Sequence, residues 1–132
     1  MDPAELSSPF VDHLGIELTE ASGSRVVARW TADERHHQPY GIVHGGVYAA
    51  AIETMGSIGG AMAAQDRGLS VVGVNNNTHF LAAVSEGRVD LVAVPIVQGR
   101  TQQLWTIDVT RASDGRLVAT GQLRLQNIEP RA

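Results

Sequence analysis

The sequence predicts an α+β fold in which a curved antiparallel β-sheet of five to six strands wraps around one long central helix. Two observations support this prediction. Residues 45–66 are small or apolar almost throughout, and Gly68 follows as a helix stop signal. Strand-like runs joined by short turns lie on both sides of that segment. Because short connections join antiparallel neighbours, these runs are expected to form one antiparallel sheet.

Each strand is expected from its own residue pattern. Two alternating runs flank a Ser-Gly-Ser break and predict a hairpin over residues 15–32. Four later runs are rich in β-branched and apolar residues, and the dipeptide Asp114-Gly115 is the clearest hairpin signal among their turns. We expect these four strands to form a meander over residues 70–84, 88–98, 102–112 and 116–128.

The remaining segments complete one domain over residues 1–132, a length sufficient for a single core. The residues up to Leu14 are expected to form a short helix or a loose lead-in. Residues 33–43 are polar, contain Pro39 and Gly41, and predict a loop. The long helix is apolar on nearly every side, so we expect it to be buried.

Composition excludes several classes of function. The net charge is −4 and no cluster of basic residues is present, which argues against nucleic-acid and membrane-surface partners. The chain has no cysteine, so disulfides and thiolate chemistry are excluded, and a reducing cytoplasm fits this composition. The N-terminus does not resemble a secretory signal. Residues 44–64 are too weakly apolar to insert in a bilayer.

Glu53 is the candidate catalytic residue. It is the only acid within residues 44–64, and that segment holds no Lys or Arg to pair with it. A buried, unpaired carboxylate has a raised pKa or lies where water or a ligand reaches it. Ser57 follows one helical turn later on the same face and could hold a water molecule against the carboxylate. The alternative is that Glu53 caps a local network or simply faces solvent.

The His44-Gly45-Gly46 sequence places free backbone N–H groups at the start of the helix, where they can receive an oxyanion. Gly45 and Glu53 are eight residues apart, which is about 12 Å along a helix axis. One small carbonyl group cannot contact both. If both act on it, they come from different chains of a two-fold dimer, which then has two composite sites.

The motif Gln-Pro-Tyr-Gly-Ile-Val-His-Gly-Gly, followed by six residues, Glu53 and then Ser57, resembles the hotdog-fold acyl-CoA thioesterases of the PaaI type. Within them it is most similar to the 4-hydroxybenzoyl-CoA, 1,4-dihydroxy-2-naphthoyl-CoA and enterobactin-proofreading thioesterases. The likeness continues through most of the chain, including the VVGVNNN, EGRV and GRTQQLW segments. It implies the hotdog fold, a homodimer or homotetramer, an acyl-CoA or aryl-CoA substrate, and no separate cofactor.

The resemblance also implies roles for five catalytic residues. Glu53 would be the nucleophile or the general base, and the Gly45 N–H would polarise the thioester carbonyl. Gln38 would sit beside that carbonyl or help to expel the thiolate. His44 would orient the loop and the substrate, and Ser57 would position the attacking water or the carboxylate.

The substrate-binding residues are expected in two groups. The thioester arm or acyl group would be lined by Gly73, His79, Phe80, Leu81 and Ala82, and the phosphates of CoA would meet the turn of Gly99, Arg100, Thr101 and Gln102. A solvated hairpin arginine is the alternative for Arg100. Phe80 and Ala82 are apolar where the dihydroxynaphthoyl and enterobactin-related enzymes carry polar or basic residues, so the acyl group stays open.

Other sites are disfavoured by spacing. The histidines, including the adjacent His36 and His37, lack the spacing of metal ligands, so no metal site is expected. The glycines of the GSIGG segment are expected to let a strand or partner helix approach closely. Trp30 and Trp105 are expected in the core. Two other functions are considered: a hotdog module that binds acyl-CoA without hydrolysing it and, ranked last, a hydratase or dehydratase acting on acyl thioesters.

Overall fold

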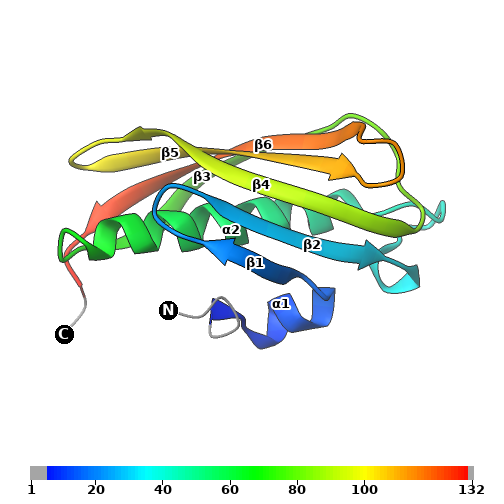
Figure 1. Ribbon diagram of the computed structural model, residues 1–132, viewed down its shortest axis with the longest axis horizontal. Helices are drawn as coiled ribbons and strands as arrows, with labels where there is room; N and C mark the ends of the chain where they lie inside the picture. Colours follow the sequence, from blue (N-terminus) through cyan, green and yellow to red (C-terminus); the bar gives the residue numbers. More distant parts are fainter. Residues whose placement is uncertain (1–5, 131–132) are drawn as a thin grey trace.

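A computed structural model, which describes residues 6–130, shows six antiparallel strands curved around one long helix (Figure 1). The predicted fold class is therefore confirmed. The expected lead-in falls partly on residues 1–5, outside the described residues. In chain order the elements are α1 Pro9–Leu14, β1 Glu17–Ala21, β2 Val26–Ala32, the short 3-10 helix η2 Glu34–His36, α2 Gly45–Gln65, β3 Ser70–Phe80, β4 Gly87–Gln98, β5 Gln102–Arg111 and β6 Leu117–Ile128.

The sheet has the strand order β1-β2-β4-β5-β6-β3, so the predicted four-strand meander is wrong in one respect. Strands β4, β5 and β6 do form a meander, but β3 pairs with β6 at the far edge rather than with β4. The connection of residues 81–86 is long enough to leave the sheet and carry the chain across it. Arg111 holds that connection by donating a hydrogen bond to the Ala83 carbonyl at 2.7 Å.

Helix α2 begins and ends where the sequence predicts. His44 caps its first turn, because the imidazole Nδ1 accepts a hydrogen bond from the Gly46 N–H at 2.7 Å. After Gln65 the chain turns through Gly68, whose φ of 69° lies in the left-handed region that glycine tolerates. The two caps leave the helix spanning 21 residues, about 30 Å.

The face of α2 that meets the sheet is built from glycines and small residues. A Cβ added to Gly59 would lie 2.3 Å from the Trp105 ring, and one added to Gly56 would lie 2.7 Å from a Leu123 methyl group. The close approach expected for these glycines is thus confirmed, with strand side chains as the neighbours. Trp30 and Trp105 are fully buried in the core, as predicted.

Within residues 6–130 the opposite face of α2 is only partly covered, by α1, so the expectation that the helix is buried holds for the sheet-facing side alone. Glu53 and Ala61 are exposed on this face, and Ser57 between them is half-buried. The sheet is a single layer and covers only one side of the helix, and small residues on the other side give the sequence no polar stripe to mark it. Within residues 6–130, no helix has the length and apolarity needed to cross a membrane.

Candidate active site

The loop before α2 places Gln38 beside the start of the helix. The Gln38 N–H donates to the Ile42 carbonyl at 2.8 Å, and the Gly41 N–H donates back to the Gln38 carbonyl at 3.0 Å. Gly41 closes this turn with a φ of 77°, a conformation that L side chains rarely adopt. The side-chain Oε1 of Gln38 accepts a hydrogen bond from the Tyr40 N–H. Its two Nε2 protons are therefore the groups left to donate to a ligand.

Gly45 is the first residue of α2 and carries a free amide. Within residues 6–130 no group accepts a hydrogen bond from its N–H, whereas the next amide, Gly46, is satisfied by His44. The free N–H lies at the positive end of the helix dipole, which favours negative charge on an acceptor. Gly45 and Gln38 line one pocket of about 460 Å³, together with Ile42, Val43, Tyr48, Phe80, Leu81, Ala82, Ala83 and Val84.

Glu53 and Ser57 line a different pocket, of about 810 Å³, on the open face of α2. The Glu53 side chain is exposed to solvent and makes no ion pair or hydrogen bond with any other residue of the 6–130 range. Its oxygens are therefore free to accept a proton from a ligand or from water. The remaining walls come from α1 and its approach, from α2 and from β3: Leu6, Ser8, Phe10, Val11, Ala49, Ala50, Thr54, Ile58, Asn76 and Thr78.

One chain does not bring all five expected catalytic residues together. Gln38 and Gly45 lie in one pocket, and Glu53 and Ser57 in the other, about 12 Å further along α2. His44 points toward neither of these two pockets and lines a small cavity beside α1. The geometry places an unbonded N–H at one end of α2 and an exposed carboxylate on the open face, and these two groups cannot contact one carbonyl group within a single chain.

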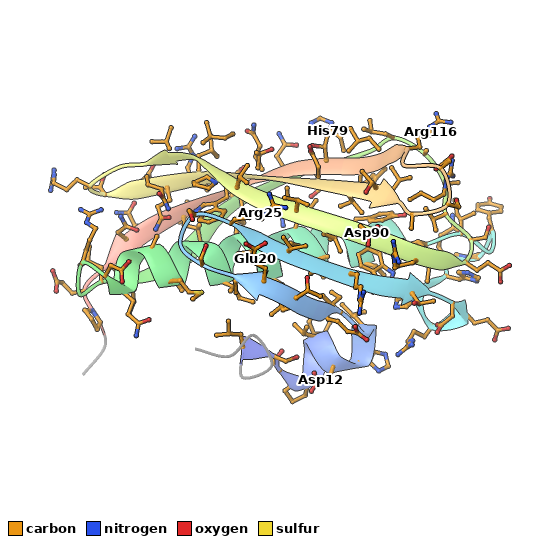
Figure 2. All side chains as sticks on the ribbon, viewed as in Figure 1. Asp12, Glu20, Arg25, His79, Asp90 and Arg116 are labelled. Atoms are coloured by element: carbon orange, nitrogen blue, oxygen red, sulfur yellow. The ribbon has the colours of Figure 1, made fainter. Side chains whose placement is uncertain are left out.

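The residues expected around the acyl group are also divided. Phe80, Leu81 and Ala82 line the pocket that holds Gly45. His79 instead lies on the side of the sheet away from α2, near Thr106 and Thr120 (Figure 2). Gly73 is exposed on β3 and lines neither main pocket.

The turn of residues 99–102 lies at the opposite end of α2 from Gly45. Arg67 donates a hydrogen bond to the Gly99 carbonyl at 3.0 Å, and Asn127 donates to the Gly99 and Arg100 carbonyls at 3.2 Å. These bonds fix the backbone of the turn and leave the Arg100 side chain exposed. The turn is about 30 Å from Gly45 along the helix, so one chain does not place it against that pocket.

Several polar residues of the two pockets were not among the expected site residues, and Tyr48, Asn76 and Thr78 are three of them. Tyr48 is 3% exposed, its hydroxyl has no hydrogen-bond partner within residues 6–130, and burial raises its pKa to about 12. Asn76 donates to the Ala49 carbonyl at 3.0 Å, and Thr78 donates to the Asn76 Oδ1 at 2.8 Å. Asparagine is depleted in strands, so the Asn-Asn-Asn run of β3 was a signal that could have pointed to this wall.

His36 and His37 form hydrogen bonds with nearby backbone groups. His36 is buried: its Nδ1 accepts from the Asp33 N–H at 3.1 Å, and its Nε2 is 2.7 Å from the Leu14 carbonyl. His37 Nε2 lies 2.6 Å from the Ser85 carbonyl. Among residues 6–130, no three His, Asp or Glu side chains converge closely enough to hold a metal ion.

Comparison with known proteins adds the family. The sequence profile described as Thioesterase superfamily matches residues 40–118. The proofreading thioesterase EntH of Cronobacter turicensis is 41% identical to the chain, over 86% of this chain and 81% of that protein. A protein of Mycobacterium tuberculosis is 42% identical, over 98% of this chain and 93% of its own length.

Solved structures agree with the sequence matches. The structure of the Mycobacterium tuberculosis protein superimposes with a TM-score of 0.90 and covers 95% of this chain and 100% of that chain. The structure of a Haemophilus influenzae thioesterase, 35% identical, has a TM-score of 0.87 over 96% of this chain and 87% of that chain.

Proposed function

This chain belongs to the Thioesterase superfamily, and we propose that it hydrolyses acyl-CoA or aryl-CoA thioesters to the free acid and CoA. The observation that carries the proposal is that one helix holds both a carboxylate, Glu53, and a backbone N–H, that of Gly45, and that neither has a hydrogen-bond partner within residues 6–130. The proposed subfamily is the branch of 4-hydroxybenzoyl-CoA, 1,4-dihydroxy-2-naphthoyl-CoA and enterobactin-proofreading thioesterases, and a similar protein named as a proofreading thioesterase supports it.

The chemistry needs only these two groups. The Gly45 N–H stabilises the oxyanion that develops on the thioester carbonyl, aided by the positive end of the helix dipole. Glu53 either activates a water molecule or attacks the carbonyl carbon itself. The thiolate of CoA leaves without a strong acid, because the pKa of a thiol is far below that of an alcohol. Gln38 donates from Nε2 beside the carbonyl, and Ser57 positions the water.

We propose that each site is shared between two chains paired through the edge strand β3. Along one chain, β3 and α2 run side by side: Phe80 lies on Gly45, and Val71 lies near Ser57 and Ile58. If two β3 edges pair antiparallel about a two-fold axis, the Gly45 end of one chain lies beside the Ser57 end of the other. Glu53 of the second chain is then brought toward Gly45 of the first.

The free edge of β3 supports this pairing. It is the last strand of the sheet order, and two large apolar side chains, Val72 and Val74, are 43% and 52% exposed on it. An exposed apolar edge strand favours pairing with another strand. A homodimer, or a homotetramer built from two such dimers, is the proposed assembly, with the turn of residues 99–102 offered to the phosphates of CoA.

The first experiment measures thiol release from a panel of acyl-CoA and aryl-CoA thioesters. Glu53→Gln is expected to lower kcat by ~10³-fold with an unchanged unfolding curve, because the carboxylate makes no ion pair or hydrogen bond within residues 6–130. Binding without turnover, unchanged by Glu53→Gln, would instead identify a non-catalytic acyl-CoA-binding module.

The second experiment removes the amide proton of Gly45. Gly45→Pro suits the first position of a helix, and His44 before it already has φ −64° and ψ 133°, as a residue preceding proline prefers. We expect kcat to fall by ~10²-fold. Gly45→Ala is the matched control, since it adds a Cβ at the same place but keeps the N–H.

The third experiment tests the shared site. Glu53→Gln and Gly45→Pro chains, each with strongly reduced activity alone, are refolded together. A composite site regenerates one intact centre in each mixed dimer, so the mixture is expected to regain about a quarter of the wild-type activity. If mixed dimers form and no activity returns, the two groups of one site belong to one chain, and the shared site is wrong.

A further inference from the structure

Among residues 6–130, no charged side chain lines the pocket beside Gly45. Among its ten lining residues only Gln38 and Tyr48 have polar side chains, and both are neutral. A charged group that contacts the pocket wall is Arg111, which donates a hydrogen bond to the carbonyl of Ala83 at 2.7 Å. The Arg111 guanidinium donates from Nε and Nη2 to the Asp114 carboxylate at 3.0 Å and 2.7 Å, so its positive charge is already paired.

Phe80 forms an exposed wall of this pocket. A Cβ placed on Gly45 would lie 2.8 Å from the tip of the Phe80 ring, so the ring rests directly on the residue that carries the free amide. The same ring packs against Tyr48, with centroids 6.2 Å apart, yet Phe80 is 58% exposed. A carbonyl oxygen bound at the Gly45 amide would therefore place its acyl group against this ring.

Resting on the proposed function, we infer that this pocket selects acyl groups that carry no charge, and that Phe80 is the residue that sets this selection. An anionic acyl group would leave water for a pocket whose own lining side chains are neutral, and Glu53 of the second chain would add only negative charge beside it. Moving an unpaired carboxylate into such surroundings has a large free-energy cost, whereas an apolar group gains from burial. Tyr48 adds no charge, because its raised pKa of about 12 keeps the hydroxyl protonated.

The test compares two thioesters of the same shape. In 5-methylhexanoyl-CoA an isopropyl group stands where glutaryl-CoA has a carboxylate. For the wild-type protein we expect kcat/KM to be at least ~100-fold higher for 5-methylhexanoyl-CoA. An equal or higher value for glutaryl-CoA would overturn the inference and leave the thioesterase proposal intact.

Three variants assign the selection to Phe80. Phe80→Arg places a guanidinium at the exposed wall and is expected to shift the ratio toward glutaryl-CoA by at least ~10-fold. Phe80→Ala changes the shape but adds no charge, so it is expected to keep the preference for the uncharged substrate. Ile96→Arg is the matched control, since Ile96 is 49% exposed on β4 outside both main pockets. A shift with Ile96→Arg equal to that with Phe80→Arg would overturn the role of Phe80.

Binding measurements separate this inference from the proposed activity. Calorimetry uses ketone analogues of the two substrates, in which a methylene replaces the thioester sulfur and prevents hydrolysis. Tighter binding of the uncharged analogue, lost in Phe80→Arg, supports the inference even if no thioester is hydrolysed. Equal binding of the two analogues would overturn it, whatever the turnover.

Discussion

The two ends of α2 differ in whether the polar groups beside them are hydrogen-bonded. At the C-terminal end, the Gln103 side chain donates to the Gly60 carbonyl at 2.9 Å and to Asn127 at 3.0 Å, and it accepts from Trp105 Nε1 at 2.9 Å. At the N-terminal end, the Gly45 amide and the Tyr48 hydroxyl have no partner within residues 6–130.

This difference separates what stabilises the fold from what awaits a ligand. Buried polar groups are nearly always hydrogen-bonded, and each exception needs an explanation. The satisfied network fixes one end of the helix against the sheet. The unsatisfied end contains the backbone donor that we assign to the substrate carbonyl. Substitutions at the two ends should therefore change different observables.

The largest effect on stability is expected from Gln103→Ala. This change removes the Gln103 partner of the Trp105 Nε1 and of the Asn127 Oδ1 and opens a cavity, which together cost about 4 kcal/mol in the free energy of unfolding. Urea denaturation measures the loss. Gln38→Ala at the other end is the control, with an expected change below ~0.5 kcal/mol and a lower kcat/KM. Equal destabilisation by both variants would contradict the division of roles.

A matched pair of glycine substitutions gives the next effect. Gly59→Ala drives a methyl group into the buried Trp105 ring, and overpacking of this kind costs about 2–3 kcal/mol. Gly45→Ala meets the exposed Phe80 ring, which can move aside, so its cost is expected to stay below ~1 kcal/mol. Thermal unfolding of the two variants measures these two losses of stability. A Gly45→Ala protein as unstable as Gly59→Ala would show that Phe80 is fixed in place.

A smaller effect of opposite sign is expected from Tyr48→Phe. Removing a buried hydroxyl that has no partner relieves its desolvation penalty, so we expect stabilisation by about 1 kcal/mol. Chemical denaturation is the measurement. A loss of more than ~1 kcal/mol would mean that the hydroxyl is hydrogen-bonded in solution, and the contrast between the two ends would weaken.

The smallest effect is a pH dependence from the ion pair that holds the connection of residues 81–86. Hydrogen bonds from the Arg111 guanidinium lower the Asp114 pKa from 3.8 to about 2. The folded state therefore gains stability from this carboxylate above about pH 4 and loses it as the pH falls toward 2. The melting temperatures of wild type and Asp114→Asn should converge over that range. Because the pair is exposed, the difference at neutral pH is expected to be small.

Residue patterns predicted the elements of the fold but not all of its pairing. The length of α2, its glycine stop and the Asp114-Gly115 turn are local features, and the structure reproduces them. The placement of β3 beside β6 depends on which strand edges meet in space, and no local pattern in residues 70–84 encodes it. The open face of α2 was missed because alanine and glycine occur on covered and uncovered faces alike.

The candidate site was predicted in the same uneven way. The eight-residue spacing predicted that Gly45 and Glu53 are too far apart to contact one carbonyl group, and the structure places them in two different pockets. The position of Gly99–Gln102 at the far end of α2, and of His79 behind the sheet, follows from the strand order and could not be read from the motif. Tyr48 was missed because its significance lies in an absent partner, which only packing reveals.

The strand order also sets when this protein can become functional. Strand β3 carries Phe80 and the edge proposed for pairing, yet its only partner in the described sheet is β6, where Ser70 meets Ile128. Such distant contacts form slowly, because a long loop must close first. During synthesis β3 therefore emerges from the ribosome before β6, and it has no strand to pair with in its own sheet until β6 follows.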